Sequence, residues 1–218
     1  MRILITAGPT QEPIDDVRFI TNASSGRMGL ALARAAVKEG HKVTVVLGPV
    51  AVQPRLKKAK IINVRTAAEM ADAVLSELAK GFDLFIATAA VGDYTPEKTT
   101  RGKISSGEGM LLQLKPTKKI TDIAKKKFPS VFVAAFKAEF GVSKKELIKR
   151  AHSKLLNEKL DVIVANDIGR NRMGSLENKV YVINRNGKVL ELGPEKKSVL
   201  ARRLLKAMTA CLLSQSSP

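Results

Sequence analysis

Two kinds of apolar pattern alternate along this chain. Short continuous runs of aliphatic and β-branched residues are typical of strands that are buried on both faces of a parallel sheet. Such runs occupy residues 2–7, 43–47, 61–64, 83–87, 131–136 and 161–165. Apolar residues recur at helical spacing at residues 28–39, 66–80, 121–127, 143–155 and 194–213. The alternation predicts an α/β fold of the Rossmann-like, doubly wound type, with a mostly parallel sheet and helices on both faces.

Local signals refine the ends of these elements. Thr66 and Ser143 each lie three positions before a glutamate, which is the spacing of a capping box at a helix start. Pro194 is predicted to introduce the last helix. Residues 179–191 predict a C-terminal antiparallel hairpin. The short apolar run at residues 110–114 predicts a strand that leaves the main sheet as part of a flap.

The first strand leads into a loop that is too long for an ordinary connection of about 2–6 residues between a strand and a helix. The loop runs from Gly8 through the charged segment at residues 11–18 to Ser24-Ser-Gly26, where the next helix begins. The unpaired N–H groups of a helix start suit phosphate or another anion. Simple capping of the helix by a serine is the alternative interpretation.

The fourth buried strand ends in the small residues of the segment at 88–94. Such residues let a planar ligand approach the backbone, and Asp93 adds one acceptor; a plain turn is the alternative. A dinucleotide site is disfavoured, because Gly8 and Gly26 are too far apart for the G-x-G-x-x-G fingerprint. In addition, Leu47 is followed by Gly and Pro, where an acidic residue for the ribose is expected.

The stretch GPTQEPIDDVRFITNASSGRMG at residues 8–29 resembles the opening of the phosphopantothenate–cysteine ligase family, also called phosphopantothenoylcysteine synthetase. Further matching motifs follow in the family's order at residues 89–93, 103–104, 121–123, 135–139, 154–155 and 161–167. The resemblance is to the synthetase half of the bifunctional bacterial coenzyme A biosynthesis protein. It implies a ligase that joins 4′-phosphopantothenate and L-cysteine through an acyl-cytidylate intermediate.

The resemblance also implies roles for the residues that match the family's motifs. Asn22 and Lys103 are the expected catalytic residues, with Lys103 lying on the flap and acting in the second half-reaction. Arg18, Asn22 and Ala90 are expected to bind the phosphopantothenate part. The expected nucleotide-binding residues are Gly8, Ser24, Ser25, Gly26, Ala89, Ala90, Asp93, Lys103, Thr121, Asp122, Ile123, Ala124, Phe136, Lys154 and Lys159.

Co-substrates and partners follow from the same resemblance. It implies CTP in preference to ATP, with Mg²⁺ bridging the triphosphate, while the metal ligands stay unassigned. It implies a homodimer whose flap, at about residues 94–115, reaches towards the partner's site, and association with or fusion to a flavin-dependent decarboxylase. Two positions depart from the family pattern. Ser105-Ser106 replaces lysines of the flap, and Glu158, with Lys159 beside it, stands where a second lysine is expected.

Composition sets the remaining limits. With 218 residues, 44% of them hydrophobic, the sequence predicts one nucleotide-binding ligase domain over residues 1–218. The single Cys211 and the lack of a leader segment fit a cytoplasmic protein, and the charged last helix does not suit a membrane span. The net charge of +18 suits small anionic substrates or nucleic acid. Aromatic residues make up only 4%, which disfavours a nucleic-acid-binding module. That module and an NAD(P)-dependent reductase are the alternative functions.

Overall fold

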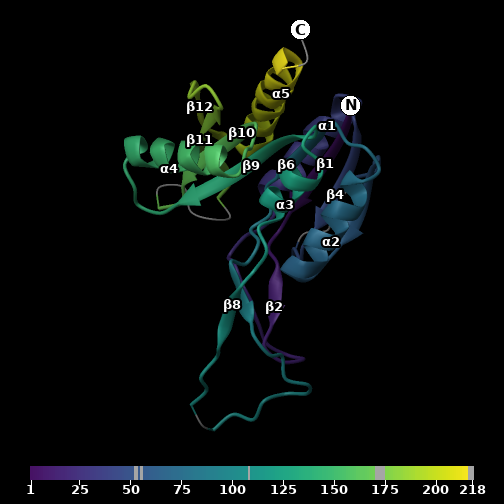
Figure 1. The fold of residues 1–218 in the computed structure, drawn as a ribbon, viewed down its shortest axis with the longest axis vertical. Coiled ribbons are helices and arrows are strands. Elements are labelled where there is room, and N and C mark those ends of the chain that lie inside the picture. Colours follow the sequence, from purple (N-terminus) through teal and green to yellow (C-terminus); the bar gives the residue numbers. More distant parts are fainter. Residues whose placement is uncertain (52–53, 55, 108, 170–174, 216–218) are drawn as a thin grey trace.

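A computed structural model of the chain describes residues 1–51, 54, 56–107, 109–169 and 175–215. Its centre is an eight-stranded sheet in the order β12-β11-β10-β9-β6-β1-β4-β5 (Figure 1). The strands of this sheet are β1 (Arg2–Ala7), β4 (Lys42–Leu47), β5 (Ala59–Asn63), β6 (Leu84–Ala87), β9 (Phe132–Glu139), β10 (Val162–Asp167), β11 (Glu177–Asn184) and β12 (Val189–Lys196).

The sheet is parallel from β10 to β5, and β11 and β12 add an antiparallel hairpin at the other edge. The central strand β1 pairs with β4 on one side and with β6 on the other. The chain therefore winds outward from β1 to β5 and then returns to the opposite side of β1. Sheets of this kind bind ligands beyond the carboxyl ends of their strands at such a switch point. The predicted fold class and the predicted C-terminal hairpin are confirmed.

Five helices cover the two faces of the sheet in the part of the chain that is described. On one face, α1 (Arg27–Lys38) and α5 (Lys197–Gln215) pack together, and Ile3 and Ile5 of β1 join their apolar cluster. On the other face lie α2 (Ala67–Leu78), α3 (Ile120–Lys127) and α4 (Lys144–Asn157). Leu4 points into the cluster on this second face. Because successive side chains of β1 pack into the apolar clusters on opposite faces of the sheet, the sequence of this strand is a continuous apolar run.

Two hairpins leave the sheet side by side and form a long arm (Figure 1). We define the arm as residues 11–21, which contain β2 (Gln11–Pro13) and β3 (Phe19–Thr21), together with residues 94–116, which contain β7 (Tyr94–Pro96) and β8 (Leu114–Pro116). The two hairpins bond to each other, since the Thr100 N–H donates to the Ile14 carbonyl over 3.0 Å. The arm thus joins the loop after β1 to the loop after β6.

The arm is fixed to the body at its base. The carboxylate of Glu12 in β2 is buried and accepts the N–H of Ala67, the first residue of α2, over 2.9 Å. A carboxylate at a helix start is favourable because of the unpaired N–H groups and the helix dipole. The Gln11 N–H donates to the Arg65 carbonyl over 2.8 Å, just before the same helix. The base of the arm is therefore fixed to the start of α2, on the second face of the sheet.

Some predicted elements differ from the structure. The strand predicted at residues 110–114 is wrong: β8 begins at Leu114, and Leu111 is 99% exposed, so the apolar run there does not form part of a buried strand. Pro194 does not introduce the last helix; it lies in β12, and α5 begins at Lys197. The predicted helix starts at Thr66 and Ser143 are confirmed, because each hydroxyl accepts the N–H three residues on.

Candidate active site

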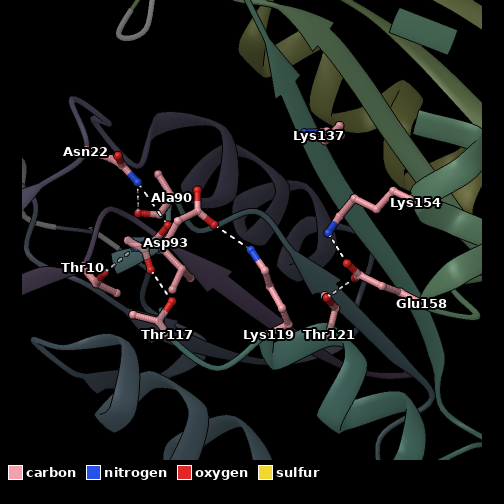
Figure 2. Close-up of polar contacts among 12 residues, drawn as sticks. Thr10, Asn22, Ala90, Asp93, Thr117, Lys119, Thr121, Lys137, Lys154 and Glu158 are labelled. Atoms are coloured by element: carbon pink, nitrogen blue, oxygen red, sulfur yellow. Dashed lines mark hydrogen bonds and ion pairs between the residues drawn. The ribbon is translucent and has the colours of Figure 1, made fainter. Parts of the chain in front are cut away.

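A cavity of about 380 Å³ opens beyond the carboxyl ends of the central strands, at the switch point between β1 and β6. One wall is the N-terminus of α1, a second is the loop that follows β6, and a third is formed by α3, the end of β9 and α4. Figure 2 shows Asn22, Ala90 and Asp93 on one side of this space and Lys154 and Lys137 on the other. The long loop after β1 and the small residues after β6 therefore meet at one site.

The first wall is a helix start without a side-chain cap. Gly26 occupies the N-cap position of α1 with a left-handed backbone, φ 69°, which glycine adopts without steric cost. No side chain caps the first turn, and Ser24 Oγ instead accepts the N–H of Gly26 over 3.3 Å. Simple serine capping, the alternative interpretation of this motif, is wrong. Since the first residues of α1 line the cavity and the first turn of a helix offers N–H groups to a ligand, the wall suits an anion.

Close packing brings this helix start against the sheet. A Cβ added to Gly29 would lie 2.5 Å from the Ala7 Cβ and 2.4 Å from the Thr88 hydroxyl. Only glycine fits this approach, which sets the N-terminus of α1 directly over the ends of β1 and β6. Gly8 does not line the cavity; it lies under Gly26, where an added Cβ would be 3.1 Å from the Gly8 Cα.

The second wall is a loop that is cross-linked to its neighbours. The Asn22 side-chain amide donates to the Ala90 carbonyl over 3.2 Å and to the Val91 carbonyl over 3.1 Å (Figure 2). The Ala90 N–H donates in turn to the Gly8 carbonyl over 2.9 Å. Two threonines fix Gly92 of the same loop. Thr10 Oγ1 accepts the Gly92 N–H, and the Thr117 hydroxyl donates to the Gly92 carbonyl. The loop after β6 is therefore more ordered than a plain turn.

The third wall contains a polar triad. Glu158, the C-cap residue of α4, accepts a hydrogen bond from the Thr121 hydroxyl of α3 over 2.7 Å and forms an ion pair with Lys154 of α4 (Figure 2). Thr121 and Lys154 both line the cavity. Lys159 does not, because it follows the C-cap with a left-handed φ of 53° and lies by a different cavity with Leu155. Glu158 therefore lies beside Lys154, at the position where the family pattern has a second lysine.

Positive side chains surround the cavity, and carboxylates hold several of them. Lys119 Nζ pairs with Asp93 Oδ1 over 2.7 Å (Figure 2), and Lys137 Nζ pairs with Glu139 Oε1 over 3.0 Å. Lys197, the first residue of α5, also faces the cavity; burial and then the charge of Arg27 lower its pKa. A bound anion would relieve this repulsion between like charges. The cationic lining is therefore suited to a phosphorylated ligand.

Sequence reasoning missed several lining residues. Asn166 and Asn178 are buried residues that line the cavity, and Lys119, Lys137 and Lys197 bring charges to it. Asn166 is the last residue but one of β10 and Lys137 lies near the end of β9, so their place at strand ends was a usable signal. Asn178 and Lys197 come from the hairpin and from α5, whose docking could not be predicted from spacing.

The predicted site residues fall into three groups. Those that line the cavity are Asn22, Ser24, Ser25, Gly26, Ala89, Ala90, Asp93, Thr121, Phe136 and Lys154. Those that lie behind or beside it, without lining it, are Gly8, Asp122, Ile123, Ala124 and Lys159. Arg18 and Lys103 belong to the arm and do not line this cavity either. Arg18 is the residue expected to bind the phosphate end of phosphopantothenate, and Lys103 is the residue expected to act in the second half-reaction.

Two further features bear on the site and on the surroundings of the chain. In the described ranges, no group of three or more His, Cys, Asp and Glu side chains is arranged to hold a metal ion. Over the same ranges, no helix has both the length and the apolar character required to cross a bilayer. Cys211 is half-buried against the α1–α5 core, and burial raises the pKa of its thiol, as expected for a packing residue.

Comparisons with known proteins agree with one another. Residues 1–212 match the family described as DNA/pantothenate metabolism flavoprotein C-terminal domain. The coenzyme A biosynthesis bifunctional protein CoaBC of Thermococcus kodakarensis is 41% identical over 186 residues, which are 85% of this chain and 45% of that protein. CoaBC of Bacillus subtilis is 38% identical over 212 residues, covering 95% of this chain and 51% of that protein. The chain thus spans about half the length of these curated relatives.

Among solved structures, the C-terminal domain of CoaBC superposes with a TM-score of 0.81 at 34% identity, covering 98% of this chain and 96% of that one. The match therefore extends over nearly the full length of both chains.

Proposed function

Because this chain belongs to the family described as DNA/pantothenate metabolism flavoprotein C-terminal domain, we propose that it is a phosphopantothenate–cysteine ligase of coenzyme A biosynthesis. The family resemblance seen in the sequence is confirmed by this match and by the CoaBC relatives. The observation that carries the proposal is the composition of one cavity. An uncapped helix start suited to phosphate and the Asn22–Ala90 pair expected to hold the pantothenate part line the same space.

The reaction has two steps. The carboxylate of phosphopantothenate attacks the α-phosphorus of the nucleotide, which forms an acyl-nucleotidyl anhydride and releases pyrophosphate. The amine of cysteine then attacks the acyl carbon, so the amide forms, the nucleoside monophosphate leaves and one proton is released. Each step moves negative charge, and preorganised N–H groups and cations lower the barrier where that charge develops. The start of α1 and the lysines of the cavity supply such groups.

CTP is the nucleotide that we propose. The loop of small residues after β6, with Ala89, Ala90 and Asp93 on the cavity wall, matches the family motif expected beside the cytidine. The kcat/KM for CTP should exceed that for ATP by about tenfold or more, since one well-made set of hydrogen bonds to a base provides discrimination of that order. Equal values for both nucleotides would remove the CTP assignment while leaving the ligase assignment in place.

Magnesium is the proposed companion of the nucleotide. Mg²⁺ keeps several waters and binds phosphate oxygens with one or two protein carboxylates, so it does not need a cluster of acidic side chains. Asp93 is a carboxylate on the cavity wall, but Lys119 pairs with it and the family motif places it beside the cytidine, so we assign it to the nucleotide and not to the ion. When bound, the ion would neutralise charge on the triphosphate.

We also propose a homodimer in which the arm completes the site of the partner. The arm exposes Val17, Tyr94, Met110 and Leu111, apolar side chains that a second copy would cover. Arg18 and Lys103 lie on this arm, outside the cavity of their own chain, so a second chain gives them a site in which to act. Association with, or fusion to, a flavin-dependent decarboxylase is proposed from the bifunctional relatives.

The deciding experiment measures pyrophosphate release and product formation with the purified protein. CTP or ATP is supplied with Mg²⁺, with and without phosphopantothenate and cysteine. Release that requires phosphopantothenate, followed by formation of phosphopantothenoylcysteine on adding cysteine, is the expected result. No release with either nucleotide would refute the ligase function. Hydride transfer to or from NAD(P), or tight salt-sensitive binding to duplex DNA, would instead favour one of the alternative functions.

A further inference from the structure

One carboxylate on the arm is buried although the arm itself stands away from the body. Asp15 lies between β2 and β3 and is 1% exposed, whereas its neighbour Asp16 is exposed. An ionised side chain is rarely buried in a thin, solvent-surrounded segment, because losing its hydration is costly unless hydrogen bonds replace it. The contacts of Asp15 therefore need an explanation.

The two carboxylate oxygens of Asp15 make different contacts. Oδ1 accepts the N–H of Val17 over 2.8 Å and the N–H of Arg18 over 2.6 Å, which is a local turn within the first hairpin. Oδ2 accepts the N–H of Ile104 over 3.1 Å, which belongs to the second hairpin. The Nε of Arg18 lies 3.6 Å from the same Oδ2. One oxygen thus shapes the first hairpin, and the other connects it to the second.

Arg18 closes this connection from the other side. Its guanidinium donates to the carbonyl of Ile104, whose N–H is already bound by Asp15. Asp15 thus holds the peptide group between Lys103 and Ile104, and Arg18 holds the next one, between Ile104 and Ser105. Asp15 therefore fixes both the direction of the Arg18 side chain and the backbone from which Lys103 projects.

The carboxylate is ionised under ordinary conditions. Burial raises its pKa, but the three backbone N–H groups and the nearby guanidinium outweigh burial, so the pKa of Asp15 lies below its usual value. Interactions of a carboxylate with a depressed pKa are present above its ordinary pKa and are lost only as the pH falls through the depressed value. The connection is therefore intact at neutral pH.

We propose that Asp15 is a positioning residue that presents Arg18 and Lys103 to one substrate as a single unit. This inference rests on the proposed ligase function, in which the two side chains serve different half-reactions. Other bonds, from Thr100 to Ile14 and between Asp16 and Gly102, also join the two hairpins, but only Asp15 contacts both the Arg18 side chain and the peptide of Lys103 among the bonds described. Without Asp15, the Arg18 guanidinium and the backbone that carries Lys103 would no longer be held in one fixed arrangement. One substitution at Asp15 should therefore impair both half-reactions.

Asp15→Asn tests the proposal, because the amide oxygen can still accept the two N–H groups of the local turn. The NH₂ group that replaces Oδ2 cannot accept the Ile104 N–H and carries no charge for Arg18, so the contacts of Oδ2 are lost while the local turn is kept. Losing a charge-assisted hydrogen bond of this kind costs about tenfold or more in an equilibrium or a rate. We expect KM for phosphopantothenate to rise about tenfold and the rate of amide formation from the acyl-nucleotide to fall about tenfold.

Two controls separate positioning from a loss of folding. The affinity for CTP alone, which depends on the cavity, should stay within about twofold of the parent value. Asp16→Asn is the matched variant: its exposed carboxylate accepts the N–H of Gly102 over 2.8 Å, and it should change both half-reactions by less than about twofold. A second variant, Ile104→Pro, removes the N–H that Asp15 accepts and should reproduce both losses.

The outcomes are distinct. Combined with Asp15→Asn, Ile104→Pro should add little, because both substitutions break the same hydrogen bond. Parent-like kinetics in Asp15→Asn, a loss in only one half-reaction, or equal losses in Asp16→Asn would overturn the positioning role. If the parent protein releases no pyrophosphate with phosphopantothenate and CTP, the ligase function itself fails, and this inference fails with it.

Discussion

The cavity and the arm carry the expected site residues in very different surroundings. Residues of the cavity lie at strand ends and helix ends, and two buried apolar clusters fix those elements. The arm has exposed apolar side chains, and it is held by Glu12 at its base and by Asp15 further out. The body of the fold thus fixes the cavity, whereas a few polar contacts fix the arm.

Under the proposed function, this difference would separate binding from completion of the reaction. A cavity formed by the sheet is present before any ligand arrives, which would suit retention of nucleotide and intermediate. In the proposed dimer, the arm would bring its cation only when the partner is in place, and it would also exclude water from a reactive anhydride. Substitutions in the two regions should therefore give different kinetic losses.

The largest effect is expected at Lys103 of the arm. A cationic donor over the anhydride stabilises the charge that develops as the amine attacks, and losing one such donor typically costs about 10²–10³ in rate. Lys103→Gln should therefore still release pyrophosphate and accumulate acyl-cytidylate while making little amide. Mass spectrometry of the quenched reaction identifies the intermediate. Loss of pyrophosphate release, or amide formation at the parent rate, would exclude this role and would mean that the Ser105-Ser106 flap works differently.

A smaller loss is expected at Asn22 of the cavity. Its amide donates to the carbonyls of Ala90 and Val91, and a carboxylate at this position would face two acceptors without a proton to share. Asn22→Asp should disturb the loop after β6 and weaken retention of the intermediate by roughly tenfold, because two hydrogen bonds at an exposed position are replaced by repulsion between oxygens. Single-turnover assays should then detect intermediate free in solution. Retention equal to that of the parent would show that the loop does not depend on this amide.

The strands of the fold could be predicted because burial on both faces gives an unmistakable pattern. The run at residues 2–7 is β1, with the predicted ends, and the run at 43–47 differs from β4 by one residue at its start. The arm could not be predicted in this way. Strands β2 and β3 have three residues each and are partly polar, so period and length give no signal. The apolar run at 110–114 was misleading because Met110, Leu111 and Leu114 are exposed.

The site was predicted where residues follow a strand directly and was missed where distant elements meet. Asn22, Ser24 and Asp93 belong to loops at the carboxyl ends of β1 and β6, and the fold alone brings those loops together. Lys197 reaches the cavity only because α5 docks beside α1, which no local pattern reveals. Lys159 has a φ of 53° at the end of α4 and lies away from the cavity; the spacing of residues along the sequence does not predict such a backbone angle.

Mixing two defective proteins tests whether cavity and arm act across chains. In a dimer of one Asn22→Asp chain and one Lys103→Gln chain, one site combines both defects, and the other combines an intact cavity with an intact arm. If subunits exchange at random, roughly half of the dimers are mixed, and total activity should recover to roughly a quarter of the parent value. Mixtures no more active than their components would show that each arm serves its own chain. Parent chains that carry two different affinity tags, mixed and then captured through one tag, give the reference for subunit exchange.

The smallest effect is expected at Glu158, which acts through a neighbour. Its carboxylate accepts the Thr121 hydroxyl and pairs with Lys154, so Glu158→Gln keeps an acceptor for Thr121 and loses the ion pair that holds Lys154. Lys154 would then lose orientation at the cavity wall, and KM for CTP should rise about 2–10-fold, with kcat within about twofold, since a single net hydrogen bond has about this value. Lys159→Gln is the matched comparison, because that side chain lies by a different cavity and should leave KM within about twofold. A larger rise in KM for CTP in Lys159→Gln than in Glu158→Gln would mean that Lys159 binds the nucleotide. The end of α4 would then have to rearrange when the nucleotide binds. The cavity wall would in that case be less rigid than its contrast with the arm requires.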